Sequence, residues 1–227
     1  MKARRKTNWS DVPYVLPFAV FIGFLALQKY FPLPPNIEFI VRDLLLAGVL
    51  AGFSRHVIQL RAHHRLETVI IGIAVFLIWI GPDLLFPTYR QHWLFQNAMF
   101  GQLSPSTIPE SVIKSPLVLW PRILQAVVFV PILEELFWRA WLMRWLISPQ
   151  FEKIPLGAYQ AGAFWITAVL FASEHGPYWD VGLIAGIAYN WWMVRTRSLG
   201  DCILAHSVTN ACLCGYVVAT RHWEYWQ

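Results

Sequence analysis

The sequence predicts an all-α fold, a polytopic membrane bundle of seven or eight transmembrane helices. Apolar residues make up 57% of the 227 residues and charged residues only 14%, whereas a soluble domain carries about 25% charged residues. Several apolar runs reach the ~17–25 residues that a helix needs to cross a bilayer. Alternating segments of about ten residues, typical of a membrane β-barrel, are absent from the sequence.

The first predicted span is the apolar run Tyr14–Tyr30, which follows a basic stretch at residues 1–13. A basic stretch before an apolar run also begins a signal peptide. This run is longer than a signal peptide requires, and prolines follow it instead of a small-residue cleavage site. We therefore predict a span that is not cleaved.

The second and third spans are predicted at Ile37–Phe53 and Thr68–Phe86. Within the second span, Arg42-Asp43 is interpreted as an ion pair, because charges are costly inside a membrane. The polar stretch between the spans contains three histidines without acidic or thiol partners: His56, His63 and His64. We interpret this stretch as a solvated loop or interfacial helix and not as a metal cluster.

Residues 87–116 form the longest interruption between apolar runs and are rich in proline and aromatic residues. A connection of this length usually has a function or short structure of its own. We expect interfacial helices that lie on the membrane.

Four further spans are predicted in the second half of the chain, at Leu117–Ile147, Gly157–Ala172, Val181–Val194 and Leu199–Thr220. Pro131 interrupts the first of them and predicts a kink. The three cysteines, Cys202, Cys212 and Cys214, all lie in the last span and lack the spacing of a zinc site. They are interpreted as packing residues.

Basic residues are distributed unevenly between the predicted loops. With the N-terminus inside, the inner loops hold ten Lys and Arg residues and the outer segments three. The positive-inside rule therefore predicts a cytoplasmic N-terminus. The net charge of +5 and the pI near 9.3 do not indicate a nucleic-acid partner, because the basic residues border the apolar runs and form no basic patch.

Two adjacent acids and an arginine lie within the apolar segment from Leu117 to Ile147. On a helix, Glu135 and Arg139 are four residues apart with the acid first, the order that favours an ion pair. Glu134 points about 100° away from Glu135 and has no local counter-ion. Glu134 is therefore the first candidate for chemistry, because an intramembrane charge without a partner suggests function.

Further polar residues lie in the last third of the chain. His175 closes one apolar run next to Glu174, and His206 and Asn210 share one face of the last helix. Asn190 is interpreted as a structural hydrogen-bonding residue between helices. Four polar groups that are costly in a membrane occur within 77 residues: Glu134, His175, His206 and Asn210. A shared function explains them better than four separate structural roles.

The residue types fit hydrolysis. A carboxylate shielded from water can act as a general base, and His175 can share the water and pass a proton to the leaving amine. His206 and Asn210 can donate hydrogen bonds to a developing oxyanion. The sequence contains no G-x-S-x-G and no H-E-x-x-H, the commonest serine- and zinc-hydrolase motifs.

Three motifs occur in order: Glu134-Glu135-x-x-x-Arg139, Phe171-x-x-x-His175 and His206-x-x-x-Asn210. Together they resemble the motifs of the CAAX prenyl protease and bacteriocin-processing family, also called Abi proteins. Gly182-x-x-x-Gly186 and the turn at residues 196–199 resemble the family too. The resemblance implies a CAAX-protease-like core at residues 117–220, with residues 1–116 as N-terminal transmembrane helices and an interfacial loop of the same integrated membrane domain.

The resemblance implies an intramembrane endopeptidase of glutamate type. In it, Glu134 and His175 activate water and His206 and Asn210 form the oxyanion hole. Glu135 and Arg139 support them. No cofactor is expected, although Glu134, His175 and His206 would imitate a two-His-one-carboxylate ligand set for a divalent metal.

The expected partners are membrane lipids and a peptide or lipidated protein substrate, in the bacterial inner (plasma) membrane. One alternative is a non-catalytic scaffold or bacteriocin-immunity-type protein that keeps the same polar network. A proton-coupled transporter using Glu134 is a poorer alternative, because inverted halves and paired broken helices are absent from the sequence.

Overall fold

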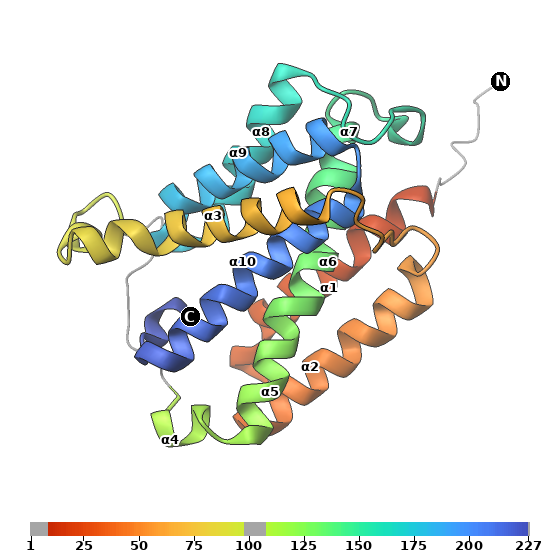
Figure 1. Ribbon diagram of the computed structural model, residues 1–227. Helices are drawn as coiled ribbons and strands as arrows, with labels where there is room; N and C mark the ends of the chain where they lie inside the picture. The colour runs from red at the N-terminus through yellow and green to blue at the C-terminus, as the bar shows by residue number, and fades with distance from the viewer. Residues whose placement is uncertain (1–8, 98–107, 227) are drawn as a thin grey trace.

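The computed structural model describes residues 9–97 and 108–226, which form helices joined by short connections (Figure 1). The predicted all-α class is confirmed. The helices of the first half are α1 (Val12–Leu27), α2 (Pro35–Val49), α3 (Arg65–Leu85) and α4 (Glu110–Ile113). Those of the second half are α5 (Pro116–Leu124), α6 (Val130–Glu135), α7 (Met143–Trp145), α8 (Ala161–Ser173), α9 (Trp179–Thr196) and α10 (Leu199–Thr220).

Each of the seven predicted spans is helical. Four helical segments of the described chain are long and apolar enough to cross a membrane: Trp9–Tyr30, Arg65–Leu85, Pro116–Trp145 and Leu199–Thr220. The apolar helix α8 is shorter. The long apolar helices indicate an integral membrane protein, and a total of seven or eight spans stays a prediction.

The interruption at residues 87–116 contains two short helices in its described part, a 3-10 turn at Tyr89–Gln91 and α4. Residues 98–107 of this stretch lie outside the described residues. The position of this stretch on the membrane therefore stays a prediction.

Helices α5, α6 and α7 belong to one continuous helix. Two π-helical stretches, Gln125–Phe129 and Leu136–Leu142, alternate with α-helix along it. Pro131 lies two residues after the end of the first stretch. Proline lacks an N–H and its ring clashes with the carbonyl four residues earlier, so the wider π turn accommodates it. π-Helical turns occur frequently at functional sites, and here they border Glu134 and Glu135 on both sides.

Helix α10 runs through the middle of the bundle, with α3 crossing close to it (Figure 1). The two helices approach closely at Gly72, whose carbonyl accepts a 2.8 Å hydrogen bond from the Thr209 hydroxyl. The Tyr189 hydroxyl of α9 in turn donates to Thr209 at 2.8 Å. These bonds tie α3, α9 and α10 together beside the polar residues of α10.

The beginning of α10 is tied to the loop before α3 through one carboxylate. Asp201 accepts hydrogen bonds from the backbone N–H groups of His63 and His64, at 3.0 and 2.9 Å, and from the Thr68 hydroxyl at 2.9 Å. Ser198 caps α10 by accepting from the Asp201 N–H. The stretch with three histidines is therefore a loop, as one of the two sequence-based interpretations has it, and two of its histidines contribute main-chain donors.

Replacing Gly72 by alanine should destabilise the protein, because an added Cβ would lie 2.6 Å from the Ala205 carbonyl oxygen and 2.7 Å from the Val208 Cβ. Overpacking of this kind costs about 1–3 kcal/mol. Gly81 on the same helix is the matched control, since a Cβ there meets nothing within 4 Å. Thermal unfolding of both variants checks the expectation, and equal unfolding temperatures would contradict the close approach.

Candidate active site

The four predicted catalytic residues line one cavity of about 540 Å³. Glu134 comes from α6, His175 from the turn after α8, and His206 and Asn210 from α10. The sequence placed Glu134 in the middle of its helix and His175 at the end of another. The cavity reconciles these positions, because it reaches both side chains.

The Glu134 side chain is 8% exposed, and its Oε2 atom forms no hydrogen bond with any described residue. A buried polar atom without a partner is rare in folded proteins and asks for an explanation. The residue lines the cavity, so this carboxylate lies beside the space that water or a ligand can enter. Glu134 is therefore the acid that the fold leaves unoccupied.

The neighbouring Glu135 is fully buried and is bound through one of its two carboxylate oxygens. Its Oε1 accepts hydrogen bonds from Arg139 Nη1 at 3.1 Å and from His206 Nδ1 at 2.9 Å. The expected i, i+4 ion pair is thus confirmed. The pair has a consequence for His206: Nδ1 is held against the carboxylate, which leaves Nε2 as the free ring nitrogen.

Arg139 is fully buried and has four partners. Besides Glu135, its Nε donates to the Asn190 Oδ1 at 3.1 Å, and its guanidinium lies 4.4 Å from the Phe171 ring centroid and 5.3 Å from that of Tyr189. The amide of Asn190 continues to the Phe164 carbonyl at 2.8 Å. The structural interpretation of Asn190 is confirmed, since it links α9 to α8 and to Arg139.

His175 is oriented by its own helix. Its Nδ1 lies 2.7 Å from the Phe171 carbonyl oxygen; because a carbonyl only accepts, Nδ1 carries the proton and Nε2 has the lone pair. Burial lowers the pKa of His175 to about 4, so the ring is neutral at pH 7. A Cβ on Gly182 would lie 3.2 Å from the His175 ring, so this glycine of α9 makes room for the imidazole.

Asn210 and His206 are held from different sides. Asn210 Nδ2 donates to the Ala126 carbonyl at 2.8 Å, within the π-helical stretch before Pro131. The His206 ring stacks on Tyr189 with centroids 5.0 Å apart. One amide hydrogen of Asn210 remains available, because the NH₂ group has two donors.

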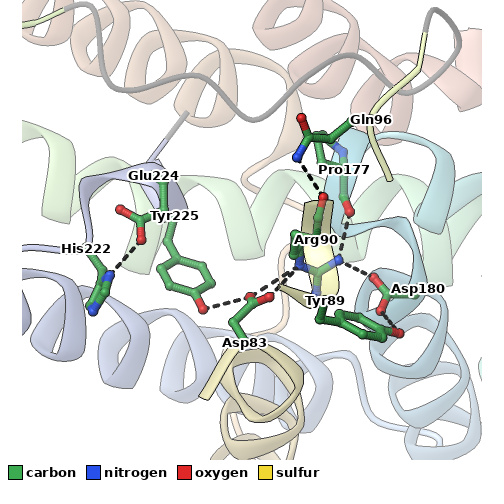
Figure 2. A network of polar contacts seen from close by, with 9 residues as sticks. All are labelled: Asp83, Tyr89, Arg90, Gln96, Pro177, Asp180, His222, Glu224 and Tyr225. Atoms are coloured by element: carbon green, nitrogen blue, oxygen red, sulfur yellow. Dashed lines mark hydrogen bonds and ion pairs between the residues drawn. The ribbon is translucent and has the colours of Figure 1, made fainter. Parts of the chain in front are cut away.

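The turn that carries His175 is clamped by Arg90, as Figure 2 shows. Arg90 donates to the Pro177 carbonyl at 2.7 Å and pairs with Asp180 at 2.6 Å and with Asp83 at 3.0 Å. Tyr225 also donates to Asp83, at 2.8 Å. This clamp joins the end of α3, the start of α9 and the C-terminal segment behind the His175 turn.

Sequence reasoning missed Arg90 and the part of the cavity that the first half of the chain builds. Arg90 was counted only as a basic loop residue, yet it is 5% exposed. Trp79 of α3 meets the His175 ring edge-on with centroids 5.1 Å apart. Arg42 and Phe39 of α2 line the far end of the cavity. The signal in the sequence that could have found these residues is that they lie close to aromatic residues.

The structure also shows where Glu174 and the three candidate metal ligands lie. Glu174 is exposed and does not line the cavity. Among the described residues, no three His, Cys, Asp or Glu side chains are grouped as metal ligands would be. Glu134, His175 and His206 share the cavity without forming such a group, and a metal bound by them stays an untested alternative.

The geometry agrees with one comparison to known proteins. Residues 116–212 match the family model described as "Rce1-like: Type II CAAX prenyl endopeptidase Rce1-like". Comparisons with curated proteins and with solved structures gave no match to the chain. The matched segment contains all four cavity residues named above and the Glu135–Arg139 pair. Over residues 116–212, the chain is therefore similar to the Rce1-like family of type II CAAX prenyl endopeptidases.

Proposed function

We propose that the chain is an intramembrane endopeptidase of CAAX-protease type, in which Glu134 and His175 activate water to hydrolyse a peptide bond. The observation that carries the proposal is the contrast between two neighbouring acids. Glu135 is bound to Arg139 and His206 through Oε1 and does not line the cavity, whereas Glu134 forms no such contact and lines the cavity that it shares with His175, His206 and Asn210.

In the proposed reaction, Glu134 takes a proton from a water molecule while the water oxygen attacks the scissile carbonyl carbon. His175 accepts a hydrogen bond from the same water through the lone pair of Nε2. This lone pair is available because the ring proton is on Nδ1, which donates a hydrogen bond to the Phe171 carbonyl. When the tetrahedral intermediate collapses, the C–N bond breaks and the nitrogen receives a proton from this pair. The products are a carboxylate and an amine.

The oxyanion is assigned to His206 and Asn210. Asn210 offers its second amide hydrogen, and His206 offers Nε2. Since Nδ1–H of His206 already donates to Glu135, the ring donates from Nε2 only when it carries both protons. The Glu135 carboxylate, 2.9 Å from Nδ1, fixes the ring and leaves Nε2 as the ring nitrogen that is not bound to this acid. Glu135 thus supports the oxyanion hole through His206.

Replacing Glu135 by glutamine should lower kcat by about 10–100-fold with little change in KM, because His206 then becomes a weaker donor to the transition state. Peptide-cleavage kinetics measure the effect. Glu152 is the control acid, since its helical turn at Phe151–Lys153 lies away from the cavity. A Glu135→Gln variant with a raised KM and a normal kcat would contradict the role.

The test of the activity is cleavage of a library of membrane-anchored peptides, lipidated and unlipidated, by the purified chain in nanodiscs, with products identified by mass spectrometry. We expect specific cleavage that persists in the presence of a chelator. Loss of cleavage on chelation, with recovery on adding a divalent metal, would contradict the metal-free mechanism. Full cleavage by the Glu134→Gln variant would show that Glu134 is not the base.

We infer further that the N-terminus faces the cytoplasm of a bacterial cell, with residues 1–116 and 117–220 forming one integrated membrane domain. The distribution of basic residues between loops supports this orientation. The proposed partners are membrane lipids and a peptide or lipidated protein substrate. Accessibility of single cysteines introduced into the loops tests the orientation.

A further inference from the structure

The cavity that contains Glu134 extends to a second polar group at its other end. That end is lined by two arginines, a glutamine and an acid among aromatic side chains: Arg42, Arg122, Gln125, Glu38, Phe39 and Trp226. Arg42, Glu38 and Phe39 come from α2, and the other charged residue, Arg122, comes from α5. This end of the cavity is called the arginine end below.

Donors at the arginine end lack acceptors. Arg42 is 5% exposed and Gln125 is 6% exposed, yet Arg42 Nε and Gln125 Nε2 form no hydrogen bond with any described residue. Arg122 forms no ion pair with a described acid, and its contacts are the faces of Phe39 and Trp226, each 5.1 Å away. Buried donors are normally satisfied, so these two unsatisfied donors, beside an arginine without an ion pair, indicate a missing acceptor.

The charges at this end also indicate a missing acceptor. Among the lining residues at this end, Glu38 is the acid, and it pairs with Arg42 at 3.5 Å. Asp43 is also buried beside Arg42 but does not line the cavity, so Arg122 is the arginine of this end that has no ion pair with a described acid. The guanidinium carbons of Arg42 and Arg122 lie 4.8 and 5.1 Å from the same Phe39 ring centroid, and like charges so close repel each other in apolar surroundings. A bound anion would relieve this repulsion.

We propose that Arg122, Arg42 and Gln125 bind a carboxylate of the peptide substrate, distant from the bond that is cleaved. This inference rests on the proposed function, because it treats the cavity as one substrate site. Arginine binds carboxylates through parallel N–H donors, and the aromatic faces of Phe39 and Trp226 hold the guanidinium groups in place. The carboxylate is either the C-terminus of the substrate or an acidic side chain.

The helix that connects the two ends of the cavity sets the spacing. Arg122 and Glu134 lie twelve positions apart on the continuous helix Pro116–Trp145, which corresponds to about 18 Å at about 1.5 Å per residue. An extended peptide covers about 3.3–3.6 Å per residue. The carboxylate should therefore lie about five residues from the scissile bond.

Binding without turnover tests the site. The protein is the full chain with Glu134→Gln, in phosphatidylcholine nanodiscs, and the probes are a dye-labelled apolar hexapeptide acid and its C-terminal amide. We expect fluorescence anisotropy to show that the acid binds at least about tenfold more tightly than the amide, since a charge-assisted bond is lost in the amide. Adding Arg122→Gln should make acid and amide bind equally.

Two variants serve as controls. Arg221→Gln removes the same charge from a side chain that is 68% exposed and outside the cavity, and it should leave the tenfold preference unchanged. Arg122→Lys keeps the charge without the forked donors, and it should retain part of the preference. Arg122→Gln is expected to fold, since it leaves no acid unpaired.

Several results would overturn the proposal. One is equal binding of acid and amide before Arg122 is changed, and another is a preference that survives Arg122→Gln. A third is that phosphatidylglycerol, but not the acid, binds in a manner that depends on Arg122, which would assign the site to a lipid phosphate. Because binding is measured without turnover, an acid preference alongside a wild-type chain that cleaves nothing would support this site and refute the proposed reaction.

Discussion

Replacing Glu134 by glutamine should lower kcat by about 10²–10⁴-fold, the range expected when a general base is removed, while the protein stays folded. Glutamine has almost the same shape as glutamate but cannot accept the proton from water. Glu134 Oε2 has no hydrogen-bond partner among the described residues, so the substitution breaks no described contact of that atom. The loss should therefore appear in peptide-cleavage kinetics and not in thermal unfolding.

Glu174 supplies the matched control for this experiment. It is an acid next to His175 in the sequence, but it is exposed and does not line the cavity. The Glu174→Gln variant should keep at least about half of the wild-type kcat, a change well below that of losing a general base. If Glu134→Gln and Glu174→Gln had the same activity, the assignment of the base to Glu134 would be wrong.

Replacing Arg139 by leucine should destabilise the protein by about 3–5 kcal/mol, the cost of leaving a buried charge without its partner. The substitution removes the ion pair with Glu135 at 3.1 Å and the bond to Asn190. For a chain of this size the change corresponds to a decrease of very roughly 6–20 °C in the unfolding temperature. Thermal unfolding in detergent, followed by tryptophan fluorescence, measures it.

A double variant separates the charge effect from lost packing. In Glu135→Gln/Arg139→Leu, no unpaired carboxylate is left in the interior, so the double variant should be more stable than Arg139→Leu alone. Arg195→Leu is a control of the same residue type at an exposed position on α9. Equal destabilisation by the single and double variants would show that the arginine acts through packing alone.

The local part of the site could be predicted from the sequence because its rules act over one helical turn. The i, i+4 order predicted the pair between Glu135 and Arg139, and the scarcity of charge in the apolar run singled out Glu134. The order of three motifs predicted which residues share the cavity. Boundaries such as Leu199–Thr220 followed from the length of the apolar runs.

The long-range part of the site could not be predicted from the same patterns. The partners of Arg90 lie 90 positions away at Asp180 and 87 at Pro177, and no periodicity connects them. Arg42 was expected to pair with Asp43, whereas the structure pairs it with Glu38, one helical turn earlier. A side chain chooses among several acids according to the packing of neighbouring helices, which a single sequence does not encode locally.

The Asp201 carboxylate bears on whether the catalytic segment is a self-sufficient module. The stretch that matches the family, residues 116–212, includes Asp201, yet the groups that donate to this carboxylate belong to residues 63–68. An excised fragment of residues 116–212 would keep every catalytic side chain and lose the partner that anchors the first turn of α10. We therefore expect the excised segment to be less stable than the same residues in the full chain, because the N-terminal part supplies these donors.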